Sequence, residues 1–177
     1  MLQKSLLSVK LYIANSNFYD SGNLVGNWVL LPLEEGILRK KLDEIQGGDG
    51  GYVVIGVKAP FKCTIENNID VLELNRKLNK LTNDDAGALM AISEYDTLTL
   101  NRIIDIALNK KYVIYENVIG EEELGYKLYK EQKLPFDIPD YLVKYVDFKA
   151  LGHEVCEKEA IHIIPEMHIA ERLLYKN

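Results

Sequence analysis

Apolar residues occupy every second position between Leu7 and Ile13, near the start of the chain. A period of two predicts a β-strand with one buried face. Two further strands are predicted, at Trp28–Leu31, where Pro32 ends the apolar run, and at Tyr52–Val57.

The segments between these strands have different patterns. Residues 15–27 are rich in Asn, Ser, Gly and Asp and are predicted to form a loop. Apolar residues recur at helical spacing within 34–45, and the glycines of 47–51 end that helix. Residues 1–61 are therefore predicted to form a ββαβ unit.

The middle of the chain, residues 62–110, has the pattern of helices and no strand signal. A first helix is predicted over 71–81, and a second over 86–94, after the capping residues 82–84. A third helix follows Asp96 and Thr97, either of which can cap it.

The last third, residues 111–177, mixes both kinds of element. A short strand at 112–115 precedes a helix at 121–132, and short helices are predicted at 140–145 and 147–157 before an apolar segment at 160–164. The fold class is therefore α+β, with three small domains at 1–61, 62–110 and 111–177: a ββαβ unit, a helical middle and a mixed α/β unit.

Composition is that of a folded protein, with 47% hydrophobic and 27% charged residues. The net charge of −6 argues against a simple DNA-binding protein. The charge is uneven, because residues 116–177 hold 13 acidic and 8 basic residues. On charge alone, the acids of this third are read as a solvated surface.

Neither catalysis nor a cofactor is predicted. The glycines of 47–51 precede a strand and lack the Lys-Ser or Lys-Thr of a phosphate-binding loop. His153, Cys156, His162 and His168 have no standard zinc spacing, so no metal is expected. No serine lies in a nucleophile motif, and Cys63 and Cys156 are read as buried free thiols.

The N-terminal segment does not resemble a signal peptide, and no apolar run is long enough to span a membrane. We therefore expect a cytoplasmic protein without membrane contact. The chain contains 11 tyrosines, and those at 126, 129, 141 and 145 interleave with Lys127, Lys130 and Lys144. Such a pattern could stack single-stranded nucleic acid, but its negative surroundings favour half-buried packing and no direct nucleic-acid binding.

Three stretches resemble the ArdA antirestriction family of conjugative plasmids and transposons. The first is residues 11–15, then Tyr19, Gly22, 26–29 and 31–32; the second is 59–61 with Leu74-Asn75. The third and most specific is Glu121-Glu122-Glu123-Leu124-Gly125-Tyr126, then Pro139, 145–148, 150–152 and Glu154.

The resemblance implies an elongated, curved dimer of three small domains whose acids mimic DNA phosphates. Such a protein occupies the DNA groove of a type I restriction-modification enzyme, and it needs no catalytic residue. Because the excess negative charge lies in the last third, we expect partner binding to depend on its acids: Glu116, Glu121, Glu122, Glu123, Glu131, Asp137, Asp140, Asp147, Glu154, Glu157 and Glu159.

A homodimer is predicted through the short apolar strand Tyr112, Val113, Ile114 and Tyr115, because an unpaired apolar edge tends to find a partner. An alternative function remains open. The net charge is low for the family, residues 55–58 lack its usual acids, and His153 follows the Leu-Gly pair where an Arg is common. The alternative is an ArdA-fold protein that binds or regulates proteins of a mobile element without mimicking DNA.

Overall fold

The computed structural model describes residues 7–48, 50–95 and 97–174. The chain separates into two compact units, Met1–Lys110 and Lys111–Asn177. Helices and two small antiparallel sheets make the fold α+β, as the sequence predicts. The predicted division between residues 61 and 62 falls inside the first unit and stays a prediction.

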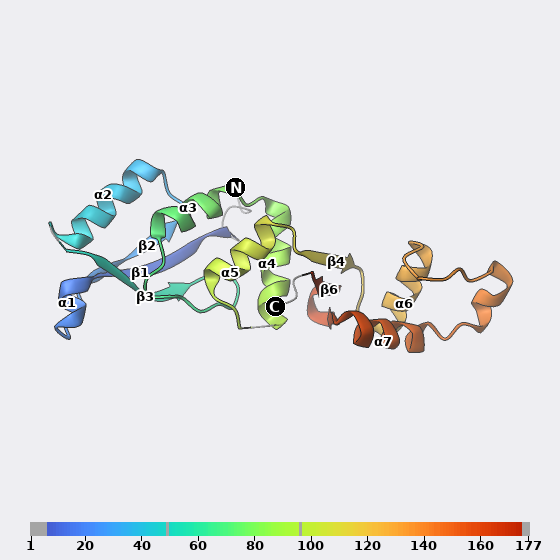
Figure 1. Cartoon of the computed structure of the whole chain (residues 1–177). Coiled ribbons are helices and arrows are strands. Elements are labelled where there is room, and N and C mark those ends of the chain that lie inside the picture. Colours follow the sequence, from blue (N-terminus) through green and yellow to red (C-terminus); the bar gives the residue numbers. More distant parts are fainter. Residues whose placement is uncertain (1–6, 49, 96, 175–177) are drawn as a thin grey trace. The chain divides into compact units, whose positions relative to one another are not determined.

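The first unit begins with a three-stranded antiparallel sheet of order β2-β1-β3. Its strands are β1 (Val9–Asn15), β2 (Gly26–Leu31) and β3 (Tyr52–Lys58). Helix α2 (Glu35–Gln46) crosses one face of this sheet (Figure 1) and buries Leu38 and Leu42 there. The three strands and α2 follow the predicted ββαβ order, but a short helix that was not predicted lies between β1 and β2.

The predicted loop at 15–27 contains a short helix, α1 (Ser16–Asp20). The Asn15 side chain starts it by accepting hydrogen bonds from the backbone N–H groups of Asn17 and Phe18. The same side chain donates to the carbonyls of Ile45 and Gln46 at the end of α2, beside Gly47 in its left-handed conformation. The Asn15 side chain thus connects the start of α1 to the end of α2, which explains its burial.

Three helices complete the first unit: α3 (Val71–Lys80), α4 (Asn83–Tyr95) and α5 (Leu100–Leu108). At the start of α4, the Asp85 carboxylate accepts hydrogen bonds from the Thr82 backbone N–H at 2.7 Å and from the Thr82 hydroxyl at 2.8 Å. Of the residues expected to cap α5, Asp96 lies outside the described residues. The cap is Thr99 rather than Thr97, with no side-chain hydrogen bond.

The second unit contains a sheet of order β4-β6-β5, with strands β4 (Tyr112–Glu116), β5 (Ile161–Ile164) and β6 (Ile169–Leu173). Helices α6 (Glu121–Lys130) and α7 (Phe148–Glu159) come between β4 and β5, with the 3-10 helix η2 (Asp140–Tyr145) between them. A second 3-10 turn, η3 (Pro165–Met167), leads into β6. The central strand β6 was not predicted from the sequence.

Candidate functional site

The acids predicted for partner binding lie at the surface of the second unit. Ten of the eleven are exposed, and Glu121 is half-buried. The acids of α6 face outward because the opposite side of that helix fills an apolar core with Leu124 and Leu128. All eleven predicted acids therefore belong to one compact unit, and ten of them are exposed to solvent.

Helix α6 displays three consecutive acids in its first turn, Glu121, Glu122 and Glu123. Its N-cap, Gly120, has no side chain with which to satisfy the free N–H groups of that turn. Carboxylates near a helix N-terminus interact favourably with the helix dipole, so the dipole tolerates this run of negative charge.

Helix α7 packs against α6 through two glycines. A β-carbon built on Gly152 would lie 1.8 Å from the Glu121 carbonyl oxygen, and one on Gly125 would lie 2.1 Å from the Phe148 carbonyl oxygen. Only glycine allows the two backbones this close. The Asp147 side chain caps α7 by accepting from the Ala150 N–H at 2.9 Å.

Four of the predicted acids are paired with bases. Glu121 Oε1 lies 2.7 Å from His153 Nδ1, and the hydrogen bond with Glu121, followed by its charge, raises the pKa of that imidazole. Glu131 forms salt bridges with Lys133 and Lys127. Both lysines lower the pKa of its carboxyl, and Lys133 has the larger effect. The remaining two pairs are Glu154 with Lys158 and Glu159 with Arg172.

The other seven acids are less engaged. Asp147 caps α7, and Asp140 accepts a long hydrogen bond of 3.5 Å from the Tyr129 hydroxyl. The remaining five make no salt bridge with any residue that the structure describes: Glu116, Glu122, Glu123, Asp137 and Glu157. In the part of the chain that the structure describes, no salt bridge neutralises the charge of these five acids.

Of the four tyrosines predicted to form this pattern, Tyr126, Tyr129 and Tyr145 contact a neighbouring ring or lysine, and Tyr141 is 72% exposed. The rings of Tyr126 and Tyr129 pack against Phe148, with centroids 5.2 and 5.7 Å away. Lys130 Nζ lies over both tyrosine rings, and Lys144 Nζ lies 4.9 Å from the Tyr145 centroid. These contacts favour packing over a surface on which bases could stack.

The strand predicted for dimerisation, β4, is an outer strand that pairs with β6 on one side only. Tyr115 is buried in the core of the second unit, and Val113 packs against that core. By alternation, Tyr112 and Ile114 point to the other face of the sheet. Any contact through β4 would therefore use its backbone edge more than the Val113 side chain.

The histidines and cysteines do not converge. Among the described residues, no group of three His, Cys, Asp or Glu side chains is placed to hold a metal ion. His153 pairs with Glu121, while Cys156 packs against the core. Burial raises the pKa of both thiols, that of Cys63 to about 11, so both stay protonated at neutral pH.

Sequence analysis missed Glu171, because it lies in the unpredicted strand β6. Its side chain is only 1% exposed, and both carboxylate oxygens lack a hydrogen-bond partner. Burial raises the pKa of this carboxyl to about 7. His162 is its cross-strand neighbour in β5, and burial lowers the pKa of that imidazole.

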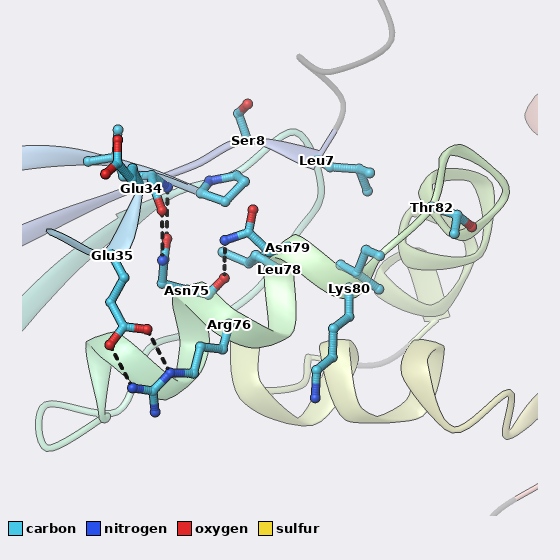
Figure 2. Close-up of a pocket in the computed structure, with 13 residues that line it drawn as sticks. Leu7, Ser8, Glu34, Glu35, Asn75, Arg76, Leu78, Asn79, Lys80 and Thr82 are labelled. Atoms are coloured by element: carbon cyan, nitrogen blue, oxygen red, sulfur yellow. Dashed lines mark hydrogen bonds and ion pairs between the residues drawn. The ribbon is translucent and has the colours of Figure 1, made fainter. Parts of the chain in front are cut away.

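A cavity in the first unit was also not predicted. Figure 2 shows it between the start of α2 and α3, with Asn75 bonded to the backbone of Leu33. Glu35 lies at its rim and binds Arg76 and Arg39, which lower the pKa of its carboxyl to about 2. Because Glu35, Asn75 and Arg76 are already bonded to protein, these contacts serve the packing of α2 on α3.

The described residues thus form an α+β protein whose second unit presents exposed carboxylates. A search of curated proteins found no match. A family model for the antirestriction protein ArdA matches residues 11–169 of the chain, which includes all eleven predicted acids. The chain belongs to the ArdA family of antirestriction proteins. In the described part of the chain, every helix is too short or too polar to cross a membrane.

Proposed function

We propose that this protein inhibits type I restriction-modification enzymes by occupying their DNA-binding groove. The observation that carries the proposal is the exposed, unpaired charge of five carboxylates on one compact unit, together with membership of an antirestriction family. Glu122 and Glu123 contribute most directly, because they project from the first turn of α6.

Duplex DNA presents about one negative charge per 1.7 Å of its axis, and proteins bind it with grooves lined by Lys and Arg. Carboxylates form charge-assisted hydrogen bonds with the same side chains. Helices α6 and α7 hold three of the five carboxylates, Glu122, Glu123 and Glu157, on a close-packed backbone, so little conformational freedom is lost when a partner binds them.

Inhibition of this kind makes and breaks no covalent bond. We therefore propose that the protein is not an enzyme, that it acts in the cytoplasm, and that it does not bind nucleic acid itself. We also propose a homodimer through the open edge of β4, since its unpaired backbone groups can continue the sheet into a second copy. A two-fold axis there would extend the charged surface across both copies.

A second candidate function is favoured by the four neutralised acids. Glu121, Glu131, Glu154 and Glu159 each have a basic neighbour, which lowers the charge available for mimicry. An ArdA-fold protein that binds other proteins of a mobile element would tolerate this pairing. It would not need to compete with DNA.

The test compares two variants that each remove two exposed, unpaired charges. Glu122→Gln with Glu123→Gln alters α6, and the matched control, Asp43→Asn with Glu44→Gln, alters α2 in the first unit. Cleavage of unmodified plasmid by a type I enzyme is measured against inhibitor concentration. The α6 variant should need roughly threefold to tenfold more protein, because each exposed ion pair contributes up to about 1 kcal/mol.

Binding to the same enzyme should also weaken with salt and be displaced by duplex DNA. Equal inhibition by the wild type, the α6 variant and the α2 variant would contradict mimicry by this surface. Binding that ignores both salt and DNA would instead support the second candidate function.

A further inference from the structure

The first sheet has a face that α2 does not cover. Val9, Leu11 and Ile13 are fully buried on the α2 side. On the other side, Trp28 and Leu30 of β2 are each 45% exposed. This is unusual for two large apolar side chains in adjacent positions of one strand face, and it marks a surface suited to a partner.

Two lysines lie on this same open face. Lys10 of β1 and Lys58 of β3 are direct cross-strand partners, and both are exposed. Like charges in this arrangement repel and destabilise a sheet. Neither lysine makes a salt bridge with any acid in the described residues. The pair therefore provides two positive charges for an anionic ligand, on a protein whose net charge is −6.

The exposed tryptophan is held in place before any partner arrives. Its ring lies over Gly56, where an added β-carbon would be 3.4 Å from the Trp28 ring. Tyr12 meets the ring edge-on with centroids 5.4 Å apart, and Lys58 Nζ lies 4.6 Å from the ring centroid. A side chain that is already fixed loses little entropy on binding.

The backbone of β2 is also available. β2 is an outer strand, and its six residues carry no charge. The Asn15 N–H donates to the Val25 carbonyl at 2.9 Å, so the backbone of Val25 faces β1. In an antiparallel pair, residues whose backbone groups bond to the neighbouring strand alternate with residues whose groups point away from it. The N–H and C=O groups of Trp28 and Leu30 therefore point away from β1. Most exposed edge strands carry charges or prolines that prevent further pairing.

We propose that β2 binds an extended, acidic segment of a partner protein, which adds a fourth strand to the sheet. Its backbone pairs with Trp28 and Leu30, its apolar side chains cover theirs, and its carboxylates reach Lys10 and Lys58. A peptide fits better than a nucleic acid, because only a peptide continues the hydrogen-bond ladder. This site is separate from the acids of the second unit and does not depend on their function.

Trp28 is the only tryptophan in the chain, so its fluorescence reports on this site alone. The probe is a synthetic octapeptide in which threonine alternates with valine and glutamate, so that valine and glutamate share one face. It should change Trp28 emission saturably. The same peptide with lysine in place of glutamate should bind about fivefold to tenfold more weakly, because two charge pairs become repulsive.

Charge reversal supplies the decisive variant. Lys10→Glu with Lys58→Glu should reverse the preference, binding the lysine peptide more tightly than the glutamate peptide. A misfolded variant would show no preference between the lysine peptide and the glutamate peptide. Lys40→Glu with Lys41→Glu makes the same charge change on the exposed side of α2, and it should keep the wild-type preference.

A second pair of variants tests the backbone edge. Leu30→Pro removes an N–H that points away from the sheet, and edge strands tolerate proline there. It should bind the glutamate peptide at least fivefold more weakly than Leu30→Ala, which keeps the N–H. Three results would overturn the proposal: equal affinity for both peptides, equal binding by the two Leu30 variants, or binding of an oligothymidylate in preference to either peptide.

Discussion

The Nδ1 atom of His153 lies 2.7 Å from Oε1 of Glu121 and so connects α7 to the first turn of α6. Glu121 raises the pKa of the imidazole, with a smaller contribution from Glu157. Protonation of His153 therefore adds a positive charge inside the group of acids proposed to contact the partner.

This pair predicts that inhibition depends on pH. As the pH rises through the raised pKa, His153 loses its charge and Glu121 regains its full negative potential. Partner binding should therefore strengthen between about pH 6 and pH 8. The ratio of wild-type to His153→Gln affinity, measured at each pH, should rise over this range. The corresponding ratio for His168→Asn, an exposed histidine elsewhere in the unit, should stay flat.

The stability of the same pair has the opposite dependence. The pKa of His153 is higher in the folded protein than in the unfolded chain. The interaction therefore stabilises the fold fully at a pH below the unfolded-state pKa, and this stabilisation is lost as the pH rises through the folded-state pKa. In an NMR titration, Glu121→Gln should lower the pKa of His153 towards its ordinary value. An unchanged His153 pKa in that variant would show that Glu121 does not cause the shift.

The glycine contact between α6 and α7 predicts a loss of stability on the smallest substitution. Gly125→Ala and Gly152→Ala should each lower the free energy of unfolding by roughly 1–3 kcal/mol, because the added methyl group meets backbone that cannot turn aside. Gly87→Ala is the matched control. Gly87 lies in α4 with open space around it, so alanine should raise stability by about 1 kcal/mol. Urea unfolding measures all three.

Glu171 predicts a substitution that stabilises the protein. Its buried carboxyl has a pKa of about 7, so the folded protein binds this proton more tightly than the unfolded chain. Stability should therefore fall as pH rises from about 4 through about 7. Glu171→Gln removes this loss and should be more stable than wild type by roughly 1–3 kcal/mol at pH 8, with a smaller difference at pH 5. A destabilised variant at both values would contradict the prediction.

The open edge of β4 predicts association. Ile114 lies in this strand, on the face opposite the core of the second unit. Ile114→Lys should give a smaller sedimentation coefficient than wild type at the same concentration, because a charged residue on an edge strand opposes further pairing. A wild-type protein that sediments as a monomer at high concentration would rule out this dimer.

Sequence patterns located most of the strands and helices because their apolar spacing is regular. The spacing of 71–81 matches α3, and that of 34–45 matches α2. Strand β6 was missed because Glu171 and Arg172 interrupt its apolar residues. A buried carboxyl without a partner contradicts the rule that charged residues face water, so polarity gave no signal there.

The acidic surface was predicted as a set of residues, but its charge was not. Whether an acid is neutralised depends on contacts far apart in sequence, such as Glu121 with His153 or Glu159 with Arg172. Spacing within a helix could indicate only the pairs of Glu154 with Lys158 and of Lys127 with Glu131, both at i and i+4. The open face at Trp28 could likewise not be predicted from the sequence. Alternation of apolar and polar residues shows that a strand has two faces, but it does not show which face stays uncovered.

The close approach of α6 and α7 divides this unit into positions that can change and positions that cannot. Gly125 and Gly152 admit no side chain, whereas the exposed acids around them touch little of the protein interior. Apart from Asp147, which caps α7, substitutions among those acids can therefore accumulate with little effect on folding. The same framework could be adapted to a different target by redistributing its surface charges, as long as the two glycines stay in place.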